Sequence, residues 1–151
     1  MDYFNSESLD SLNKIYRINL INSITGYKSA NLLGTVSKNG IENLAVFSSV
    51  THLGSNPALL SFFVRPNVVP RNTYKNIKDN KFFTVNHISK GKIEDAHHTS
   101  AKYKEEISEF EKTNLQSEYK SNWGAPFVKD SARGQAYIDT DSANSVASAI
   151  E

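Results

Sequence analysis

An Asn-Gly pair, Asn39-Gly40, separates two runs rich in β-branched and other apolar residues, and it is the strongest local signal in the chain. Both runs lie within NLLGTVSKNGIENLAVFSSV, residues 31–50. Asn-Gly tolerates the positive φ values that a tight hairpin turn requires. The pattern therefore predicts a β-hairpin here and a fold built on a sheet.

Three more runs have the composition of strands. Residues Ile15–Ile24 alternate apolar and polar side chains, although imperfectly. A turn at 52–57 leads into Ala58–Val64, which reads as a buried strand, and Lys81–Ile88 is a further β-rich run. Strands at such short intervals, with helices inserted between them, predict a mainly β fold, a small barrel with helical decoration.

Two helices are predicted between or after these strands. The segment TYKNIKDN has helical spacing, and Thr73 at its start is a residue type that caps helices. Over 103–110 the apolar residues recur at i, i+4 and i+7, with charged residues on the other face. We interpret Glu105 and Glu109 on that face as solvated charges rather than as a catalytic pair.

Length and composition exclude several classes of protein. A chain of 151 residues is one ordinary domain. Its hydrophobic fraction is 38%, and remains 38% if the 7 Gly are counted in place of the 7 Tyr, against about 45–50% on the Gly-containing set. This thin core is compatible with a partner chain or ligand that completes it. A net charge of +1 argues against a broad nucleic-acid surface, and the lack of cysteine excludes disulfides. Without a membrane-span or signal-peptide pattern, we expect a cytoplasmic protein with no membrane partner.

No motif in the sequence is typical of metal or nucleophilic catalysis. The four histidines, which include the adjacent pair His97 and His98, contain no i, i+4 pair of the zinc-helix type. The G-x-S-x-G elbow and the common phosphate loops are also absent. We therefore name no catalytic residue and expect no metal.

A more diffuse site remains open. Arg71 and Thr73 stand at a predicted helix start, where free N–H groups and the positive end of the dipole attract an anion. Ser48 and Ser49 end a hairpin strand that also carries Asn43. A phosphorylated cofactor would suit this arrangement, whereas a simple cap with solvated arginines would explain it equally well.

The run KSANLLGTVSKNGIENLAVFSSVTHLGSNPALLSFFVRP closely resembles the core of the flavin reductase-like proteins that have an FMN-binding split barrel. RNTYKNIKDNKFFTVNHI and AHHTSAKYKEEISEFEK resemble the next segments of that family, in the same order. The resemblance covers about residues 15–130. It implies a split β-barrel with inserted helices.

The resemblance also implies a set of cofactor-binding residues. The NLA-x-FSS block would border the flavin ring and ribityl chain, with backbone N–H groups meeting the pyrimidine carbonyls. The R-N-T block would hold the phosphate, and AHHTSA would close over the cofactor. The residues so implied are Asn43, Leu44, Ala45, Ser48, Ser49, Arg65, Arg71, Thr73 and, more weakly, His97, Thr99 and Ser100. Leu44 and Ala45 could equally be core residues, since strand side chains alternate between faces.

The activity implied by the resemblance is that of an FMN-binding oxidoreductase. Family members typically pass a hydride from the nicotinamide of NADH or NADPH to flavin N5, usually as homodimers with the flavin near the interface. Some relatives supply reduced flavin to an oxygenase. The alternatives are a flavin-binding or carrier module without turnover, or an inactive truncated member of the family.

The resemblance ends near residue 130. The last stretch, ARGQAYIDTDSANSVASAIE, does not look like the strands that complete the family's barrel. Its one β-like fragment is Ala136–Ile138, and a weak helix after Asp141 or disorder is expected for the rest. We therefore expect a polar arm over 1–14, an incomplete FMN-binding split-barrel domain over 15–130, and an atypical tail over 131–151. This pattern suggests a truncated or frame-altered chain whose last strands are missing.

Overall fold

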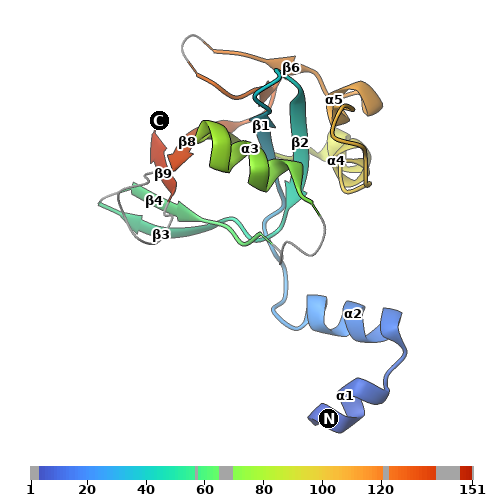
Figure 1. Cartoon of the computed structure of the whole chain (residues 1–151). Coiled ribbons are helices and arrows are strands. Elements are labelled where there is room, and N and C mark those ends of the chain that lie inside the picture. The colour runs from blue at the N-terminus through green and yellow to red at the C-terminus, as the bar shows by residue number, and fades with distance from the viewer. Residues whose placement is uncertain (1–3, 57, 65–69, 121–122, 139–146, 151) are drawn as a thin grey trace.

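The computed structural model describes residues 4–56, 58–64, 70–120, 123–138 and 147–150. Its main element is a seven-stranded antiparallel sheet with the strand order β2-β1-β5-β8-β9-β4-β3 (Figure 1). The strands of this sheet are β1 (Asn31–Val36), β2 (Glu42–Phe47), β3 (Thr51–Ser55), β4 (Ala58–Ser61), β5 (Phe82–His87), β8 (Arg133–Ile138) and β9 (Ala147–Ile150).

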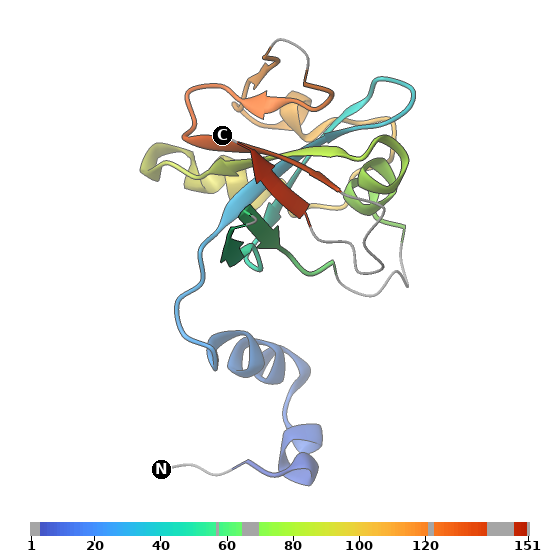
Figure 2. The ribbon, with the colours of Figure 1, turned by 90° about the vertical axis from the view of Figure 1, so that its left-hand side faces the viewer.

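Short helices and a two-stranded ribbon complete the described part of the chain. The helices are α1 (Ser6–Ser11), α2 (Lys14–Ser23), α3 (Asn72–Asn80), α4 (Ile93–His98) and α5 (Glu109–Lys112), with a 3₁₀ turn at Lys90–Lys92. The ribbon pairs β6 (Ser117–Glu118) with β7 (Phe127–Val128). In both ribbon views α1 and α2 stand away from the sheet, whereas α3 lies across it (Figures 1 and 2). No described helix has the length and apolar character needed to cross a membrane.

The predicted hairpin is confirmed. Strands β1 and β2 pair in a register that places Val36 opposite Glu42, and the turn between them contains Gly40 with a φ of +81°. The Ser37 hydroxyl oxygen also accepts a hydrogen bond from the Ile41 N–H at 3.0 Å. Glycine adopts this left-handed conformation without steric cost, which explains why the turn forms where Asn-Gly occurs.

The sheet carries a separate apolar cluster on each face of the β1–β2 hairpin. Leu33 packs with Ile77 of α3, and the same cluster contains Phe83 and Val85 of β5. Leu32 and Leu44 pack on the opposite face, with Ala96 of α4 and with Leu115 and Val128. Because strand side chains alternate between faces, neighbouring residues of one strand belong to different clusters.

Helix α3 and strand β5 confirm two further predictions, but other elements differ. Ile15–Ile24 was expected to be a strand, and most of it belongs to α2. Asn13 caps this helix by accepting a hydrogen bond from the Ile15 N–H at 2.9 Å, and no sheet edge lies beside the segment to pair with it. The turn expected at 52–57 is mostly strand β3, and β4 is shorter than the Ala58–Val64 run.

The predicted helix over 103–110 is also wrong. Helix α5 begins only at Glu109, after a turn, and the Ser108 hydroxyl accepts a hydrogen bond from the Phe110 N–H at 3.3 Å. This side-chain cap competes with helix propagation from the preceding residues. The i, i+4, i+7 pattern therefore arises from separate loop and helix contacts.

The C-terminal stretch contributes two strands, contrary to the expectation that the last strands are missing. Strand β8 pairs with β5 over five residues, and β9 pairs with both β8 and β4. These pairings satisfy backbone groups of β5 and β4 that would otherwise form open sheet edges. The segment 139–146, which includes the start of the helix expected after Asp141, lies outside the described residues.

Candidate functional site

The residues expected to bind flavin gather on β2 and at the start of α3. On β2 the alternation of the strand divides them between the two faces. Asn43 is buried towards α3, where its Nδ2 donates to the Thr73 Oγ1 at 3.0 Å and to the Thr35 Oγ1 at 3.1 Å. Leu44 is fully buried in the opposite cluster. Both side chains therefore serve the protein interior, and at these two positions only the backbone can face a ligand.

Backbone geometry makes β2 a candidate binding edge. This strand lies at one end of the seven-stranded sheet. The Leu44 N–H donates to the Glu109 Oε2 at 2.8 Å, so it points away from β1. In an antiparallel ladder the outward direction recurs every second residue. The N–H of Val46 accordingly points towards the same outer edge.

The two serines at the end of β2 have different surroundings. Ser48 is exposed. The Ser49 hydroxyl donates to the Phe63 carbonyl oxygen at 3.2 Å and accepts from the Phe63 N–H at 3.0 Å. Ser49 thus fastens the chain that follows β4 to the end of β2, and Ser48 is the serine of this pair whose side chain faces solvent.

Thr73 does not cap α3, contrary to the prediction. The N-cap is Arg71, and no side chain accepts a hydrogen bond from the first turn. Thr73 is instead buried, because Asn43 recruits its hydroxyl into a polar network beneath the helix. Asn76 joins this network by donating to the Thr35 Oγ1 at 3.2 Å. The result is a nine-residue helix whose N-terminal amides have no side-chain acceptor and whose cap residue is an exposed arginine.

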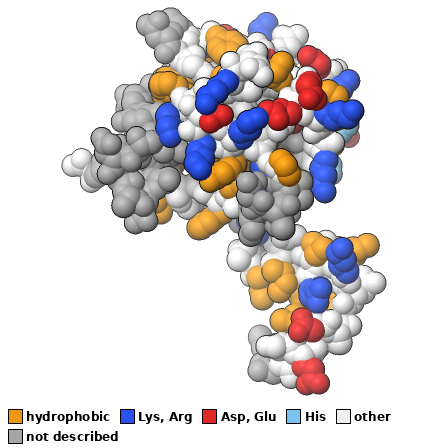
Figure 3. Space-filling model, viewed as in Figure 1, with side chains coloured by type: hydrophobic (Ala, Val, Ile, Leu, Met, Phe, Trp, Pro, Cys, Tyr) orange, Lys and Arg blue, Asp and Glu red, His pale blue; other side chains and the backbone are white. Residues whose placement is uncertain are grey.

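Charged side chains surround the outer side of α3. Figure 3 shows basic and acidic groups close together on this face. A hollow of about 230 Å³ opens among them. It is lined by Pro70, Arg71, Asn72, Tyr74, Lys75, Lys78, Asp79 and Glu105. Lys75 forms an ion pair with Glu105, which agrees with the expected solvated role of that carboxylate.

The remaining predicted residues do not join this group. Helix α4 packs through Ala96 on the face of β2 opposite to α3. His97 and Ser100 are exposed there, whereas Thr99 is buried and donates to the Ala96 carbonyl oxygen at 2.8 Å. Arg65 lies outside the described residues. Among the residues that the structure describes, no group of three His, Asp or Glu could hold a metal ion.

Glu109 is a buried residue that the sequence interpretation placed in solvent. Only 5% of it is exposed, and it neutralises an outward N–H of the candidate binding edge. Burial raises the pKa of its carboxyl, and the hydrogen bond from Leu44 partly offsets this. The signal in the sequence was Ser108, a residue type that caps helices, directly before it.

We expect the burial of Glu109 to make stability fall as pH rises. The folded protein retains a proton that the unfolded chain releases near the ordinary value of 4.5, so the free energy of unfolding decreases between that value and the raised pKa. Glu109→Gln keeps an oxygen acceptor but does not ionise, and should flatten this decrease. Urea unfolding from about pH 4 to about pH 8 measures the difference.

Glu111→Gln is the matched control, because Glu111 is an exposed carboxylate on the same short helix. Its pH profile should follow that of the unsubstituted chain. If both glutamine variants gave the same profile, the pKa of Glu109 would not be the source of the slope.

The curled sheet with α3 on one face and short helices on the other is that of split-barrel proteins. The family model described as "Flavin reductase like domain" matches residues 25–145. The chain belongs to this flavin reductase-like family.

A solved structure from Shewanella frigidimarina NCIMB 400, provisionally assigned as a flavin reductase with a split barrel domain, is 38% identical. The match covers 100% of this chain and 79% of that one, with a TM-score of 0.89. A curated protein from Aquifex aeolicus (strain VF5), described as uncharacterised, is 34% identical over 100 residues. That match covers 65% of this chain and 51% of the relative, so the aligned part spans about half the length of the relative.

Two more distant structures share the fold. Nitrilotriacetate monooxygenase component B from Bacillus cereus is 18% identical with a TM-score of 0.78, covering 99% of this chain and 77% of that one. An NADH:FAD oxidoreductase from Streptomyces globisporus C-1027 is 14% identical with a TM-score of 0.70, covering 93% and 84%. These likenesses establish the split-barrel architecture.

Proposed function

We propose that this chain binds FMN along the outer edge of β2 and at the start of α3, and that it reduces the flavin with NADH or NADPH. The observation that carries this proposal is the N-terminus of α3, where the first turn has no side-chain cap and Arg71 is exposed beside it. Membership of the flavin reductase-like family supports the same assignment.

The described residues fit a flavin mononucleotide. The amides of the first turn of α3 and the Arg71 guanidinium offer hydrogen bonds and positive charge to a phosphate. The outward N–H of Val46 offers a donor to a carbonyl oxygen of the flavin ring, and Ser48 offers an exposed hydroxyl to the ribityl chain. Asn43, Leu44 and Thr73 then act from the interior by holding β2 and α3 in place.

The chemistry needs few side chains. The flavin, when bound, supplies a hydride acceptor at N5 for the nicotinamide C4. The contribution of this chain is to fix the ring against a rigid strand and to direct N–H donors at the position where negative charge develops on reduction. No acid–base residue is required, which agrees with our naming no catalytic residue.

The first experiment is an absorbance spectrum after incubation with FMN and gel filtration, followed by addition of NADH and then of NADPH. Flavin bands that co-elute with the protein and bleach with either nucleotide are expected. Retained flavin that neither nucleotide bleaches would indicate a carrier module instead. A folded protein that retains no flavin and shows no turnover with added FMN would contradict the proposed function.

Arg71→Ala is expected to weaken FMN binding by about 10–100-fold, because a charge-assisted hydrogen bond contributes roughly 1.5–3 kcal/mol. Arg71→Lys should fall between the two, since lysine keeps the charge but not the bidentate geometry. Fluorescence quenching of FMN measures the dissociation constants. Lys38→Ala is the control, because Lys38 is an exposed turn residue paired with Asp79 at 3.3 Å. An equal loss in both alanine variants would show a general charge effect.

We also propose that the chain acts as a homodimer, as the thin core suggests, and that reduced flavin passes to an oxygenase. The fold shared with a monooxygenase component B supports the second proposal. Oxidation of the reduced flavin by a purified flavin-dependent oxygenase, measured with and without a dialysis membrane between the two proteins, would test it.

A further inference from the structure

The N-terminal part of the described chain, residues 4–30, forms a helical extension that stands off the sheet (Figures 1 and 2). Its second helix, α2, has no buried residue. Ile15 is 69% exposed, and every residue from 21 to 30 is exposed. Figure 3 shows apolar side chains gathered on this extension. The large apolar residues exposed on it are Ile15, Tyr16, Ile18, Ile21, Ile24 and Tyr27.

These side chains are distributed around α2 rather than along one stripe. At 100° per residue, Ile15 and Ile18 point to one side, whereas Tyr16 points away from them. A helix that lies on a membrane surface needs one apolar and one strongly charged face. A helix that is apolar on several sides is instead typical of burial within protein. The distribution therefore favours a protein surface as the partner of the extension.

The same chain carries an exposed surface that matches the extension in character. No Asp, Glu, Lys or Arg occurs between Phe47 and Val64, and none occurs in residues 18–27 of the extension. Within the first of these segments Leu53 and Phe63 are large, exposed and apolar. Strand β3 is the terminal strand of the sheet. An uncharged edge strand is a pairing surface that proteins ordinarily cover.

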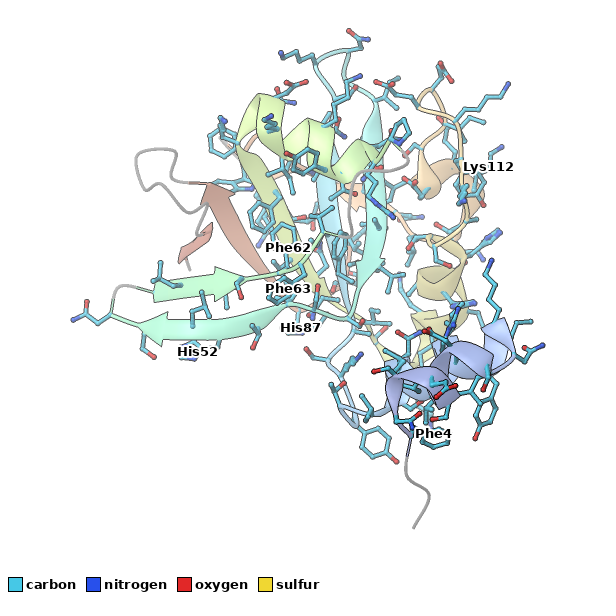
Figure 4. The ribbon with its side chains drawn as sticks, turned by 60° about the horizontal axis from the view of Figure 1, so that its bottom comes forward. Phe4, His52, Phe62, Phe63, His87 and Lys112 are labelled. Atoms are coloured by element: carbon cyan, nitrogen blue, oxygen red, sulfur yellow. The ribbon has the colours of Figure 1, made fainter. Side chains whose placement is uncertain are left out.

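The base of the extension lies beside this surface. The Ser29 hydroxyl donates to the Val50 carbonyl oxygen at 3.4 Å, at the junction between β2 and β3. From there the extension and the β3–β4 hairpin leave the body in different directions, as Figure 4 shows with Phe4 on one and His52 on the other. The extension therefore does not cover the hairpin of its own chain.

We propose that residues 14–27 dock on the β3–β4 hairpin of a second copy of this chain, in a two-fold exchange. This inference rests on the proposed homodimer. In a two-fold arrangement each extension covers the partner's hairpin and each hairpin receives the partner's extension, so one contact satisfies both exposed surfaces. The exposed apolar side chains of the extension present on the order of 800 Å², about the share of one partner in a stable interface.

The exchange also places the partner near the candidate flavin edge. Ser49 is bonded to Phe63, and Val50 holds the base of the extension. The partner's extension would thus border the rim where β2 ends. This arrangement gives the homodimer a role in completing the site.

A test changes the apolar face without weakening the helix. The triple variant Ile15→Gln, Ile18→Gln and Ile21→Gln keeps helix propensity, because glutamine is a better helix former than isoleucine. We expect the unsubstituted full chain to elute as a dimer in gel filtration with light scattering, at twice the chain mass of 16.8 kDa. The triple variant should be a monomer, with a dimer dissociation constant raised roughly 100-fold or more. Asn19→Gln with Asn22→Gln is the matched control on the same helix and should remain a dimer.

A variant that remains dimeric would overturn the exchange and leave the homodimer standing. A monomeric unsubstituted chain would overturn both, whereas retention of FMN in the same fractions tests flavin binding separately. Circular dichroism establishes that the variants are folded.

The absence of cysteine allows a direct test of the docking position. One chain would carry Ile24→Cys and a differently tagged chain Leu53→Cys, and a short bismaleimide would be added to the mixture. We expect cross-linked product that contains both tags. A dimer that yields no such product would overturn docking on the hairpin.

Discussion

Gly34→Ala is expected to destabilise the protein by about 3 kcal/mol or more and to leave little folded protein at 37 °C. Gly34 lies in the middle of β1 and is buried. A Cβ added there would overlap the carbonyl oxygen of Pro126 and would lie 2.5 Å from the Thr84 Oγ1. The first of these neighbours is backbone and cannot rotate away. Thermal and urea unfolding measure the loss.

The reason for this sensitivity is a close approach of three segments. The Thr84 hydroxyl donates to the Pro126 carbonyl oxygen at 2.6 Å, directly across the Cα of Gly34. An alanine must break that bond or push the β7 segment away from the sheet. Gly91→Ala is the control, because nothing lies within 4 Å of a Cβ at that position. Equal stability of the two variants would mean that the β7 segment moves freely, contrary to this account.

Asn86→Ala should cost a comparable amount, about 3 kcal/mol or more, because its buried amide joins three segments. The Asn86 Nδ2 donates to the Leu32 carbonyl oxygen at 3.1 Å and to the Thr84 Oγ1 at 2.9 Å. Its Oδ1 accepts from the Val128 N–H at 2.9 Å. Alanine removes all three bonds and leaves buried groups without that partner. Urea unfolding gives the free-energy difference.

Asn114→Ala is the comparison, since Asn114 is exposed and donates through its side chain to the Asp95 Oδ1 at 3.3 Å. Its loss should be about 0.5 kcal/mol or less, because water replaces an exposed partner. A small effect at Asn86 would show that water enters the cluster around Val128 and satisfies the exposed groups.

Several elements could be predicted because their causes are local. The turn at Gly40 depends on the backbone freedom of one residue, and β5 depends on a continuous apolar run. Helix α3 follows from spacing within nine residues. The position of Arg71 at the start of that helix was predicted for the same reason.

Other features depended on which segments meet in space. Thr73 was predicted to cap α3, but Asn43, 30 residues away in the sequence, recruits its hydroxyl. Glu109 was placed in solvent, whereas the Leu44 N–H, 65 residues away, draws its carboxylate under the sheet edge. Neither partner is marked by local spacing, because a hydrogen-bonding side chain carries no record of its acceptor in the sequence around it.

The same distinction separates α2 from the strand that its isoleucines suggested. β-Branched residues favour strands only where a neighbouring strand completes the ladder, and no strand lies beside Ile15–Ile24. Local capping by Asn13 then decides in favour of a helix. Sequence patterns alone thus established the hairpin, α3, β5 and the family resemblance, since these depend on residues close together in the chain. The tertiary structure decided which polar groups are buried, which edge of β2 remains available, and which apolar helix stands exposed, since these depend on contacts between segments far apart in the chain.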